Sequence, residues 1–348
     1  MRTASLIHAC RIAVVVQIVF TIATIAPNAV AADVPELTAV KIGATNDPQI
    51  GGPWVIAKEK GFFASEGLTE GDVMLFSSGP QSFPPFVSGD IQGDSSGDQP
   101  MYTQAAGGVP LKLLAIYSEI SGVHGVVASS AVRSVKDLEG KSVGLPKGST
   151  AEWYMRSLCK SVGCDTSKMK ILAMAPPEGV TALVSGDIDV LSGWQPFLDR
   201  AIDAGKAKGV HFIHYNNTSY LAGAEGPKKV ENAYGVFYVT TKFLASNPRT
   251  VEAMLRALDK ACNFINANKS EAAKIIARVY KNDEAQMARW VSEIQFGVLV
   301  NDERLQYLQA NADVLLNEKL IRQPVDVKAL FDPAPLKRVR ADAVVTKQ

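Results

Sequence analysis

Cysteine and histidine, the residues that build disulfide frameworks and zinc sites, are scarce in this chain. Its 348 residues include four of each. Three cysteines follow the N-terminal segment, and an odd number argues against a fold built on disulfides. His211 and His214 have no acidic or thiol side chain at ligand spacing around them, so the sequence predicts no metal site and no cofactor.

An excess of charge of either sign is also missing. Lys plus Arg number 36 and Asp plus Glu number 35, so no overall field attracts the chain to nucleic acid or to an anionic membrane surface. We therefore expect no nucleic-acid partner. After the N-terminal segment no apolar run is long enough to cross a membrane, and the remaining length is enough for about two domains.

One long apolar run is present, at the N-terminus, over residues 12–25. Arg2 and Arg11 precede or adjoin it, and the small residues 29–31 follow it. This order is typical of a secretory signal that signal peptidase removes. A membrane anchor needs about 20 apolar residues, which is more than this run supplies. We predict a signal peptide over 1–31 and export of the mature protein.

In an exported protein a disulfide can form and persist. Cys159 and Cys164 flank the end of a predicted helix near Gly163, and we predict that they are bridged. Cys262 lies in an apolar segment and is expected to be a reduced, buried residue.

Two stretches about a hundred residues apart repeat one pattern. S-G-D-I at 88–91 is followed by S-G-x-Q-P at 96–100, and the same pair recurs at 185–188 and 192–196. An internal repeat of this kind indicates two similar α/β lobes. Small ligands usually bind in a cleft between lobes.

Strands alternate with helices in both halves of the chain. This alternation predicts a largely parallel sheet in each lobe, flanked by helices, with the ligand loops at the carboxyl ends of the strands. The predicted strands are 37–42, 73–76, 111–116, 142–145, 170–174 and 188–191, and the predicted helices are 54–63, 150–162, 178–185, one from Pro248, 270–280, 283–293 and 302–317.

The second lobe is predicted to be inserted into the first. We assign 38–130 and 229–348 to lobe one and 131–228 to lobe two. The segments 125–128 and 234–239 resemble each other and bracket the second lobe. We predict that these two segments pair as crossover strands and form a two-strand hinge.

Three passages, at 58–68, 134–144 and 182–189, resemble a known family. They are similar to the periplasmic substrate-binding proteins of ABC importers, in the branch that handles sulfonates, taurine, nitrate and thiamine precursors. The resemblance covers nearly the whole chain after the signal. It implies a type II periplasmic-binding-protein fold, and a monomer in the periplasm that delivers a small-molecule solute to an ABC permease in the inner membrane.

The resemblance also bears on the ligand. It implies a sulfonate-like or carboxylate-like anion or a zwitterion. Gln92 and Gln195 depart from the residues usual at their positions, so the resemblance supports the fold more strongly than it supports one ligand class.

Candidate ligand residues lie in the loops that follow strands. Gly148, Ser149 and Thr150 begin a helix directly after a strand, so free backbone N–H groups and the positive end of the helix would meet two hydroxyls, an arrangement that suits an anion. Helix capping alone is the alternative. The loop at 77–81 makes a similar arrangement from lobe one.

The S-G-x-Q-P loops add a ring and a carboxylate. Trp194 is predicted to form a wall of the cleft, and Asp98 occupies the same loop position in lobe one. If Asp98 and Asp47 face the cleft, a zwitterion or a polar heterocycle fits better than a simple anion. The full set of predicted ligand residues is Asn46, Asp47, Gln49, Ser77, Ser78, Gly79, Gln81, Asp98, Gln99, Tyr117, Gly148, Ser149, Thr150, Trp194 and Gln195.

The predicted function is binding and delivery, without catalysis. Two alternatives stay open: a two-lobe enzyme, such as a pyrimidine-precursor synthase-like protein or a hydrolase, and a sensor module for a membrane signalling protein. The string G-x-S-x-G at 93–97 fits the nucleophile elbow of a hydrolase. The internal repeat explains this string better, because the lobe-two counterpart keeps the loop without the first Gly and the first Ser.

Overall fold

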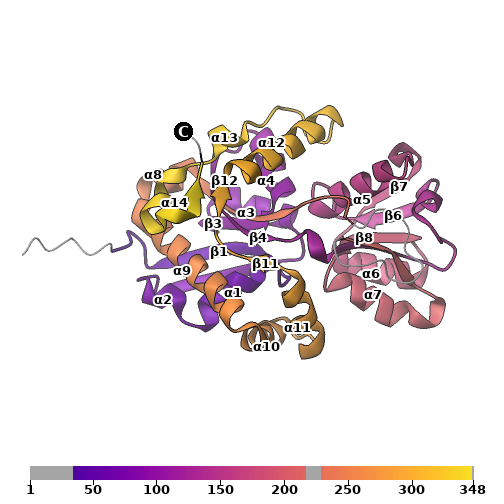
Figure 1. Ribbon diagram of the computed structural model, residues 1–348, viewed down its shortest axis with the longest axis horizontal. Helices are drawn as coiled ribbons and strands as arrows, with labels where there is room; N and C mark the ends of the chain where they lie inside the picture. Colours follow the sequence, from indigo (N-terminus) through magenta and orange to yellow (C-terminus); the bar gives the residue numbers. More distant parts are fainter. Residues whose placement is uncertain (1–33, 217–228, 347–348) are drawn as a thin grey trace, which may run out of the picture. The chain divides into compact units, whose positions relative to one another are not determined.

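The computed structural model describes residues 34–216 and 229–346, and two β-sheets organise them (Figure 1). The predicted signal segment, 1–31, lies outside the described residues. Within the described ranges no helix is long and apolar enough to span a membrane.

The first sheet belongs to lobe one and has six strands in the order β11-β4-β10-β3-β1-β2. β1 pairs in parallel with β2 and β3, whereas β10 is antiparallel to β3 and β4. Its strands are β1 (Ala39–Thr45), β2 (Glu70–Phe76), β3 (Gly93–Gly97), β4 (Leu111–Glu119), β10 (Tyr234–Thr240) and β11 (Gln295–Phe296).

The second sheet belongs to lobe two and has the order β7-β6-β8-β5-β9. β6 is parallel to β7 and β8, whereas β5 is antiparallel to β8 and β9. The four other strands of this sheet therefore share one direction, as β1 to β4 do in lobe one. Its strands are β5 (His124–Ala128), β6 (Ser142–Leu145), β7 (Lys170–Ala173), β8 (Val190–Trp194) and β9 (His211–Tyr215).

β5 and β10 contain the two segments that were predicted to pair as the hinge, and that pairing is wrong. β5 lies between β8 and β9 in the second sheet, although 38–130 was assigned to lobe one, and β10 lies between β3 and β4 in the first sheet. The chain crosses between the lobes just before each of these strands, at 120–123 and between β9 and β10. Their sequences are alike because they are the equivalent antiparallel strands of two similar lobes.

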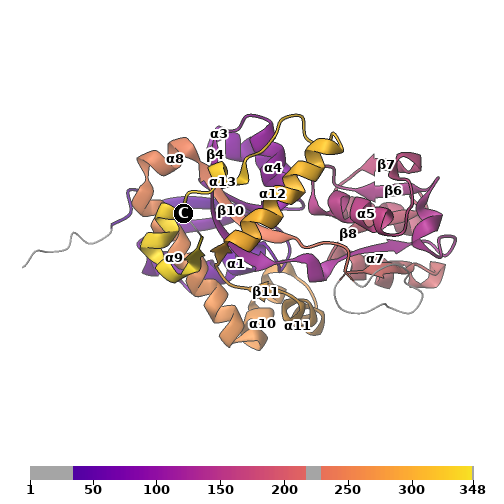
Figure 2. The same ribbon diagram turned by 45° about the horizontal axis from the view of Figure 1, so that its top comes forward.

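Helices flank both sheets (Figures 1 and 2). A short two-stranded ladder, β12 (Val300–Asn301) with β13 (Val344–Val345), stands apart from them. The helices are α1 (Gly51–Glu59), α2 (Phe62–Ser65), α3 (Phe83–Ser88), α4 (Asp98–Ala106), α5 (Thr150–Ser161), α6 (Pro176–Ser185), α7 (Phe197–Gly205), α8 (Thr241–Ser246), α9 (Pro248–Ala267), α10 (Lys269–Tyr280), α11 (Glu284–Glu293), α12 (Asp302–Asn317), α13 (Val327–Leu330) and α14 (Pro333–Val339).

The S-G-D-I repeat ends a helix in each lobe. Gly89 follows α3 with φ 87° and Gly186 follows α6 with φ 95°, a left-handed conformation that glycine adopts at low cost. In both copies the serine hydroxyl donates to the aspartate two residues on, at 2.7 Å in 88–91 and 2.6 Å in 185–188. The repeated motif therefore builds a turn.

The isoleucine of each copy fills a space that a strand glycine leaves open. A Cβ on Gly43 of β1 would lie 2.3 Å from Ile91 Cδ1, and a Cβ on Gly144 of β6 would lie 2.6 Å from Ile188 Cδ1. Both distances are shorter than carbon atoms tolerate, so glycine is required for the helix turn to pack closely on the strand.

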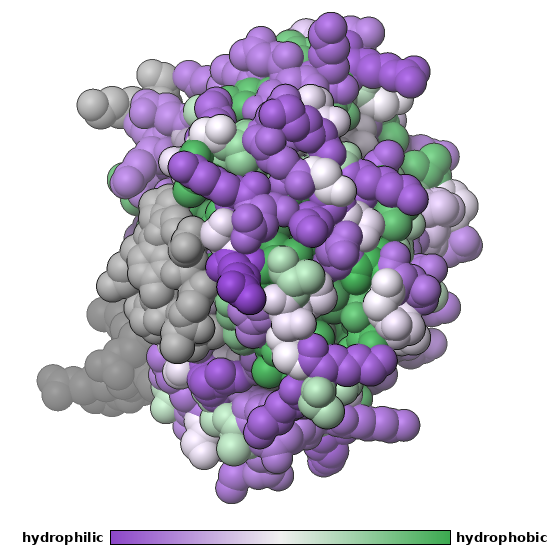
Figure 3. Space-filling model, turned by 90° about the vertical axis from the view of Figure 1, so that its right-hand side faces the viewer, coloured by the Kyte–Doolittle hydropathy of each residue, from purple (hydrophilic) through white to green (hydrophobic). Residues whose placement is uncertain are grey.

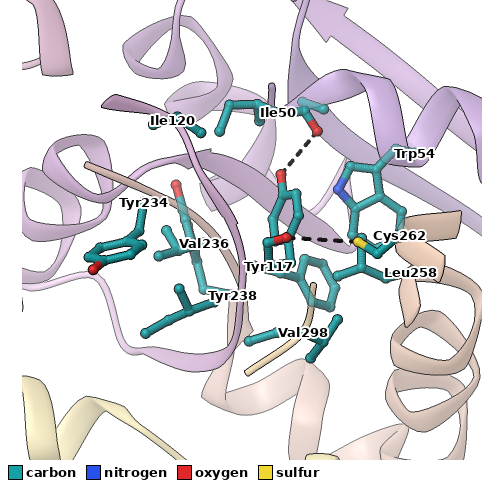
Figure 4. Packing of buried hydrophobic residues seen from close by; sticks show 14 of the residues in the cluster. Ile50, Trp54, Tyr117, Ile120, Tyr234, Val236, Tyr238, Leu258, Cys262 and Val298 are labelled. Carbon is teal, nitrogen blue, oxygen red and sulfur yellow. Dashed lines mark hydrogen bonds between the residues drawn. The ribbon is translucent and has the colours of Figure 1, made fainter. Parts of the chain in front are cut away.

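The main hydrophobic core lies in lobe one, around the first sheet. Figure 4 shows Tyr117 inside it, with its hydroxyl donating to the Ile50 carbonyl at 3.0 Å and the Cys262 thiol 3.8 Å from the Tyr117 carbonyl. Cys262 is free and buried, and Cys159 is bridged to Cys164, so both cysteine predictions are confirmed.

Lobe two buries most of its apolar side chains in two smaller clusters, one built around α5 and the other around α6 and α7, while Trp153, Trp194 and Phe197 belong to the main core. Figure 3 shows that the side of this lobe at the right of Figure 1 is mostly hydrophilic, with scattered apolar groups. The second sheet is thus covered on both faces, as an α/β lobe requires.

Candidate functional site

A small cavity, the central cavity, lies where strand ends of the two lobes meet. It encloses about 10 Å³, which is room for about one water molecule. Residues that follow β1 and β3 form it from lobe one, and residues that follow β6 or end β8 form it from lobe two. Its lining is Thr45, Asp47, Gln49, Ile50, Gly79, Gly97, Pro100, Ile120, His124, Ser149, Thr150 and Trp194.

Asp47 is the acidic residue of this lining. It is buried, and its Oδ1 accepts a hydrogen bond from the Ile50 backbone N–H at 2.8 Å. Burial raises the pKa of Asp47 to about 6, although hydrogen bonds oppose the rise. The carboxylate is therefore mostly ionised at pH 7. No Lys or Arg occurs among the described residues that line the cavity, so the site favours a ligand group that is cationic or donates hydrogen bonds.

Three buried polar atoms of the lining have no hydrogen-bond partner among the described residues. They are Oγ1 of Thr45 and Oε1 of Gln49 from lobe one and Nε1 of Trp194 from lobe two. The Gln49 amide nitrogen reaches the Gln195 carbonyl across the lobes at 3.4 Å, which leaves its oxygen without a donor. A buried polar atom without a partner costs about 1–3 kcal/mol. A polar solute that offers one donor to Gln49 and one acceptor to Trp194 would remove the cost at these two atoms.

His124, the first residue of β5, lines the cavity next to the first crossing. Its Nδ1 lies 2.5 Å from Oε1 of Glu231, which precedes β10, and both side chains are buried. Burial lowers the pKa of His124 to about 4, against the attraction of nearby carboxylates, and raises the pKa of Glu231 well above its usual range. Burial thus favours the neutral pair, in which the Glu231 carboxyl donates to Nδ1.

The start of α5 reaches the cavity from lobe two. Neither Ser149 nor Thr150 caps the helix, because the Ser149 hydroxyl donates instead to the Pro146 carbonyl at 2.6 Å and no described side chain caps α5. Thr150 packs against lobe one, where a Cβ on Gly97 would lie 2.4 Å from its methyl group. The capping alternative for these two hydroxyls is therefore wrong.

Six of the fifteen residues predicted from the sequence meet in the central cavity. Their approach follows from the fold, because the carboxyl ends of parallel strands share one edge of a sheet. The six are Asp47, Gln49, Gly79, Ser149, Thr150 and Trp194.

Asp98 is buried and is bonded within lobe one. Its carboxylate accepts from the Tyr102 hydroxyl and the Asn311 amide, both at 3.2 Å, and from the Tyr234 N–H at 3.5 Å. Burial raises the pKa of Asp98 to about 7. Asp98 does not line the central cavity. Its carboxylate is therefore not placed to contact a ligand there.

The other predicted residues lie around the central cavity without lining it. Tyr117 is in the core, and Gln81 accepts from the backbone and hydroxyl of Ser77, both at 3.0 Å. Gln99 and Gly148 line a neighbouring pocket. The remaining ones are exposed Asn46, buried Ser78, and Gln195, whose amide donates to Asp199 at 2.8 Å.

The structure adds lining residues that sequence reasoning missed. Thr45 ends β1, while Ile120 and His124 belong to the first crossing and the strand after it. The sequence could have indicated these residues by their position alone, because they lie at the end of a strand or where the chain passes between the lobes. The crossing was placed later in the chain, at the wrong pair of segments, and so His124 was overlooked.

The hydrolase motif at 93–97 forms β3, and all five of its residues are buried. Its central serine, Ser95, accepts a hydrogen bond from the Trp54 indole at 2.7 Å. A nucleophile elbow places its serine on an exposed turn between strand and helix. Ser95 stands inside the strand, which this motif does not allow.

A second set of contacts joins the lobes on the side of α11 (Figure 1). The Tyr215 hydroxyl of β9 donates to Glu293 at 2.5 Å, and the Trp290 indole donates to Asp199 of α7 at 3.0 Å. Asp199 also pairs with Arg289 and is bonded to Gln195. We call this set, with the bond from Gln286 to Asp203 at 3.1 Å, the α11 latch.

Comparisons with known proteins agree with this geometry. A protein of Bacillus subtilis (strain 168), provisionally named as an aliphatic sulfonates-binding protein, is 24% identical over 331 residues, which are 93% of this chain and 95% of that protein. The taurine-binding periplasmic protein of Escherichia coli (strain K12) is 27% identical over 154 residues, 44% of this chain and 48% of the relative.

Solved structures share the fold. The alkanesulfonate-binding protein SsuA from Xanthomonas axonopodis pv. citri, bound to MOPS, superposes with a TM-score of 0.73 at 20% identity, over 85% of this chain and 98% of that chain. The two-lobe periplasmic-binding-protein fold predicted from the sequence is thereby confirmed. The family model described as NMT1/THI5 like matches residues 51–272, well over half of the sequence. The chain belongs to the NMT1/THI5-like family.

Proposed function

We propose that this protein is an extracytoplasmic solute-binding protein of an ABC importer, which acts as a monomer in the periplasm. It captures a small zwitterion or organic anion between its lobes and hands it to a permease. The relatives named as binding sulfonates and taurine support solute binding for import. The signal expected at 1–31 supports the compartment.

The observation that carries the proposal is that both lobes bring unpartnered buried atoms to the central cavity. Gln49 supplies an acceptor from lobe one and Trp194 supplies a donor from lobe two. The cavity holds about one water in this structure, so the lobes must part to admit a larger solute. A solute that bonds to both atoms then gains its full contacts only when the lobes close on it. Binding therefore stabilises the closed arrangement relative to an open one, which is the condition for a ligand-driven closure.

The charge of the cavity selects among solutes. Asp47 favours an ammonium or another donor group, whereas the start of α5 with the Thr150 hydroxyl favours an anionic group. A zwitterion satisfies both ends at once. This combination supports an amino-sulfonate or an amino-carboxylate over a simple anion such as nitrate.

The proposal is tested with two ligands that differ in one group. Taurine has an ammonium and a sulfonate, and ethanesulfonate has only the sulfonate. Calorimetry should give tighter binding of taurine than of ethanesulfonate to the wild type. Asp47→Asn should weaken the binding of taurine by on the order of 1.5–3 kcal/mol, which is the usual contribution of a hydrogen bond to a charged group. The binding of ethanesulfonate should be unchanged or slightly tighter.

The matched control is Asp72→Asn, an exposed carboxylate on β2 that pairs with Lys58 far from the cavity. It should leave both affinities unchanged. Native mass spectrometry of freshly purified protein should show one small solute bound to each chain. Equal losses for both ligands in Asp47→Asn would remove the zwitterion assignment, and the absence of any solute binding would remove the proposed function.

A further inference from the structure

A larger pocket, the side pocket, opens beside the central cavity. It has a volume of about 520 Å³ and lies between α4 and the end of α12 from lobe one and the start of α5 from lobe two. Ser149 lines both the side pocket and the central cavity. The two spaces are therefore neighbours, and each draws walls from both lobes.

Two buried polar side chains border the side pocket without a hydrogen-bond partner among the described residues. Gln99 of α4 is 2% exposed and uses neither atom of its amide, and Trp153 of α5 is 8% exposed and leaves its indole N–H unused. Unpaired buried donors raise the free energy of the folded protein, and a ligand that bonds to them removes that cost. The two donors come from different lobes.

The charge of the side pocket is opposite to that of the central cavity. Lys147 and Lys319 line it from the two lobes, are exposed, and form no ion pair with another described residue. Its one carboxylate, Glu152, is already matched, because it pairs with Arg156 at 2.9 Å and accepts from the Gly148 N–H at 2.9 Å. The lining therefore offers two uncompensated positive charges.

We propose that the side pocket binds an oxyanion group, such as a sulfonate, carboxylate or phosphate. Gln99 and Trp153 donate hydrogen bonds to its oxygens, and Lys147 and Lys319 supply the charge. The group is either the far end of a solute whose ammonium lies at Asp47, which rests on the proposed function, or a separate small anion. If the group is the far end of a solute, the protein should be selective for longer zwitterions, because the ammonium and the oxyanion then lie in two adjoining spaces.

The test uses the double variant Lys147→Gln/Lys319→Gln, whose exposed positions tolerate the change. Its control, Lys160→Gln/Lys170→Gln, removes the same charge from exposed positions of lobe two outside the pocket. Calorimetry compares taurine, 3-aminopropanesulfonate and 4-aminobutanesulfonate as zwitterion probes. Thermal shift in sodium sulfate at constant ionic strength tests the free anion.

For a solute that spans both spaces, the wild type should bind the longest probe most tightly. The affinity of the double variant for that probe should then be about tenfold lower than that of the wild type, and its affinity for taurine less than twofold lower. The control variant should keep its affinity for both ligands. Gln99→Leu should repeat the length-dependent loss. For a free anion, sulfate should stabilise the wild type and the control but not the double variant, with no dependence on probe length.

The proposed function and the side pocket fail in different ways. If no zwitterion binds the wild type, the zwitterion assignment of the proposed function fails and the sulfate arm still decides on the pocket. If the double variant and its control respond alike to every probe and to sulfate, the side pocket is not an oxyanion site. That result overturns the inference whether or not taurine binds.

Discussion

The two S-G-x-Q-P loops start from the same sequence and end in different surroundings. In lobe one, Asp98 begins α4 and is enclosed by Tyr102, Asn311 and the backbone of β10. In lobe two, Trp194 ends β8 and faces the central cavity with an unpartnered indole N–H. The repeated sequence joins a strand to a helix in both lobes, but Asp98 is the first residue of its helix whereas Trp194 is the last residue of its strand. The residue at the variable position therefore decides between folding and binding.

The variable position of lobe one gives the largest expected effect, on stability. Burial raises the pKa of Asp98 to about 7, from about 3.9 in an unfolded chain. Between about pH 4 and 7 the folded protein keeps a proton that the unfolded chain has lost. This contribution to stability is therefore present below pH 4 and is lost as the pH rises to 7.

Asp98→Asn cannot lose that proton. Relative to wild type, its free energy of unfolding should rise by on the order of 3–4 kcal/mol between pH 4 and pH 7. Urea unfolding at several pH values in this window measures the difference. Its affinity for taurine should stay within about twofold of wild type, because Asp98 does not line the cavity. A pH-independent stability difference, or a large loss of affinity, would remove the contrast between the loops.

The variable position of lobe two should act on binding. Trp194→Ala removes a buried ring from the cavity wall and should cost about 2–3 kcal/mol of affinity. Trp194→Phe keeps a ring and loses only the Nε1 donor, so its loss should be about 1 kcal/mol. Calorimetry with taurine measures both variants, and thermal unfolding without ligand checks that they fold. Affinity unchanged in the alanine variant would show that the second loop is structural too.

The fold was predictable from the sequence because its signals are local and repeated. The strand at 142–145 and the helix at 302–317 were predicted with the bounds that the structure has. β3 was missed as a strand because Gly93, Asp94 and three small residues carry no hydrophobic alternation. Its burial depends on tertiary contacts, such as the Trp54 indole on Ser95.

The site was predictable only in part. Loops after strands were found by position, which brought Asp47, Ser149 and Trp194 to the right place. The sequence does not show in which direction each side chain points. Asp98 and Tyr117 were therefore predicted as ligand residues, although both point into lobe one. His124 was missed because its partner Glu231 is 107 residues away, a distance over which sequence patterns give no pairing.

The other half of the repeat, S-G-D-I, should behave alike in both lobes. Gly43→Ala and Gly144→Ala place a Cβ within 2.3 and 2.6 Å of the Cδ1 atoms of Ile91 and Ile188, and each should destabilise the protein by about 1–2 kcal/mol through overpacking. Adding Ile91→Val or Ile188→Val to the matching variant should recover part of that loss. Chemical unfolding measures all four, and a loss confined to one lobe would show that the repeat is not structurally equivalent.

The smallest expected effect concerns contacts between the lobes, set against a matched contact within one lobe. Tyr215→Phe removes the hydroxyl that donates to Glu293 in the α11 latch, and Tyr102→Phe removes a buried hydroxyl that donates to Asp98 inside lobe one. Each hydrogen bond is worth about 0.5–1.5 kcal/mol, but only the first should be broken when the lobes separate.

Tyr215→Phe should therefore lower the affinity for every solute by one common factor, about two- to tenfold. The reason is that a less populated closed state lowers the apparent affinity whatever the chemistry of the ligand. Tyr102→Phe should lower the free energy of unfolding and leave affinity unchanged. Calorimetry with taurine and ethanesulfonate, together with urea unfolding, separates the two variants. If Tyr215→Phe changes the ratio of the two affinities, the latch acts on the ligand site itself. If it changes neither affinity, these contacts do not contribute to closure.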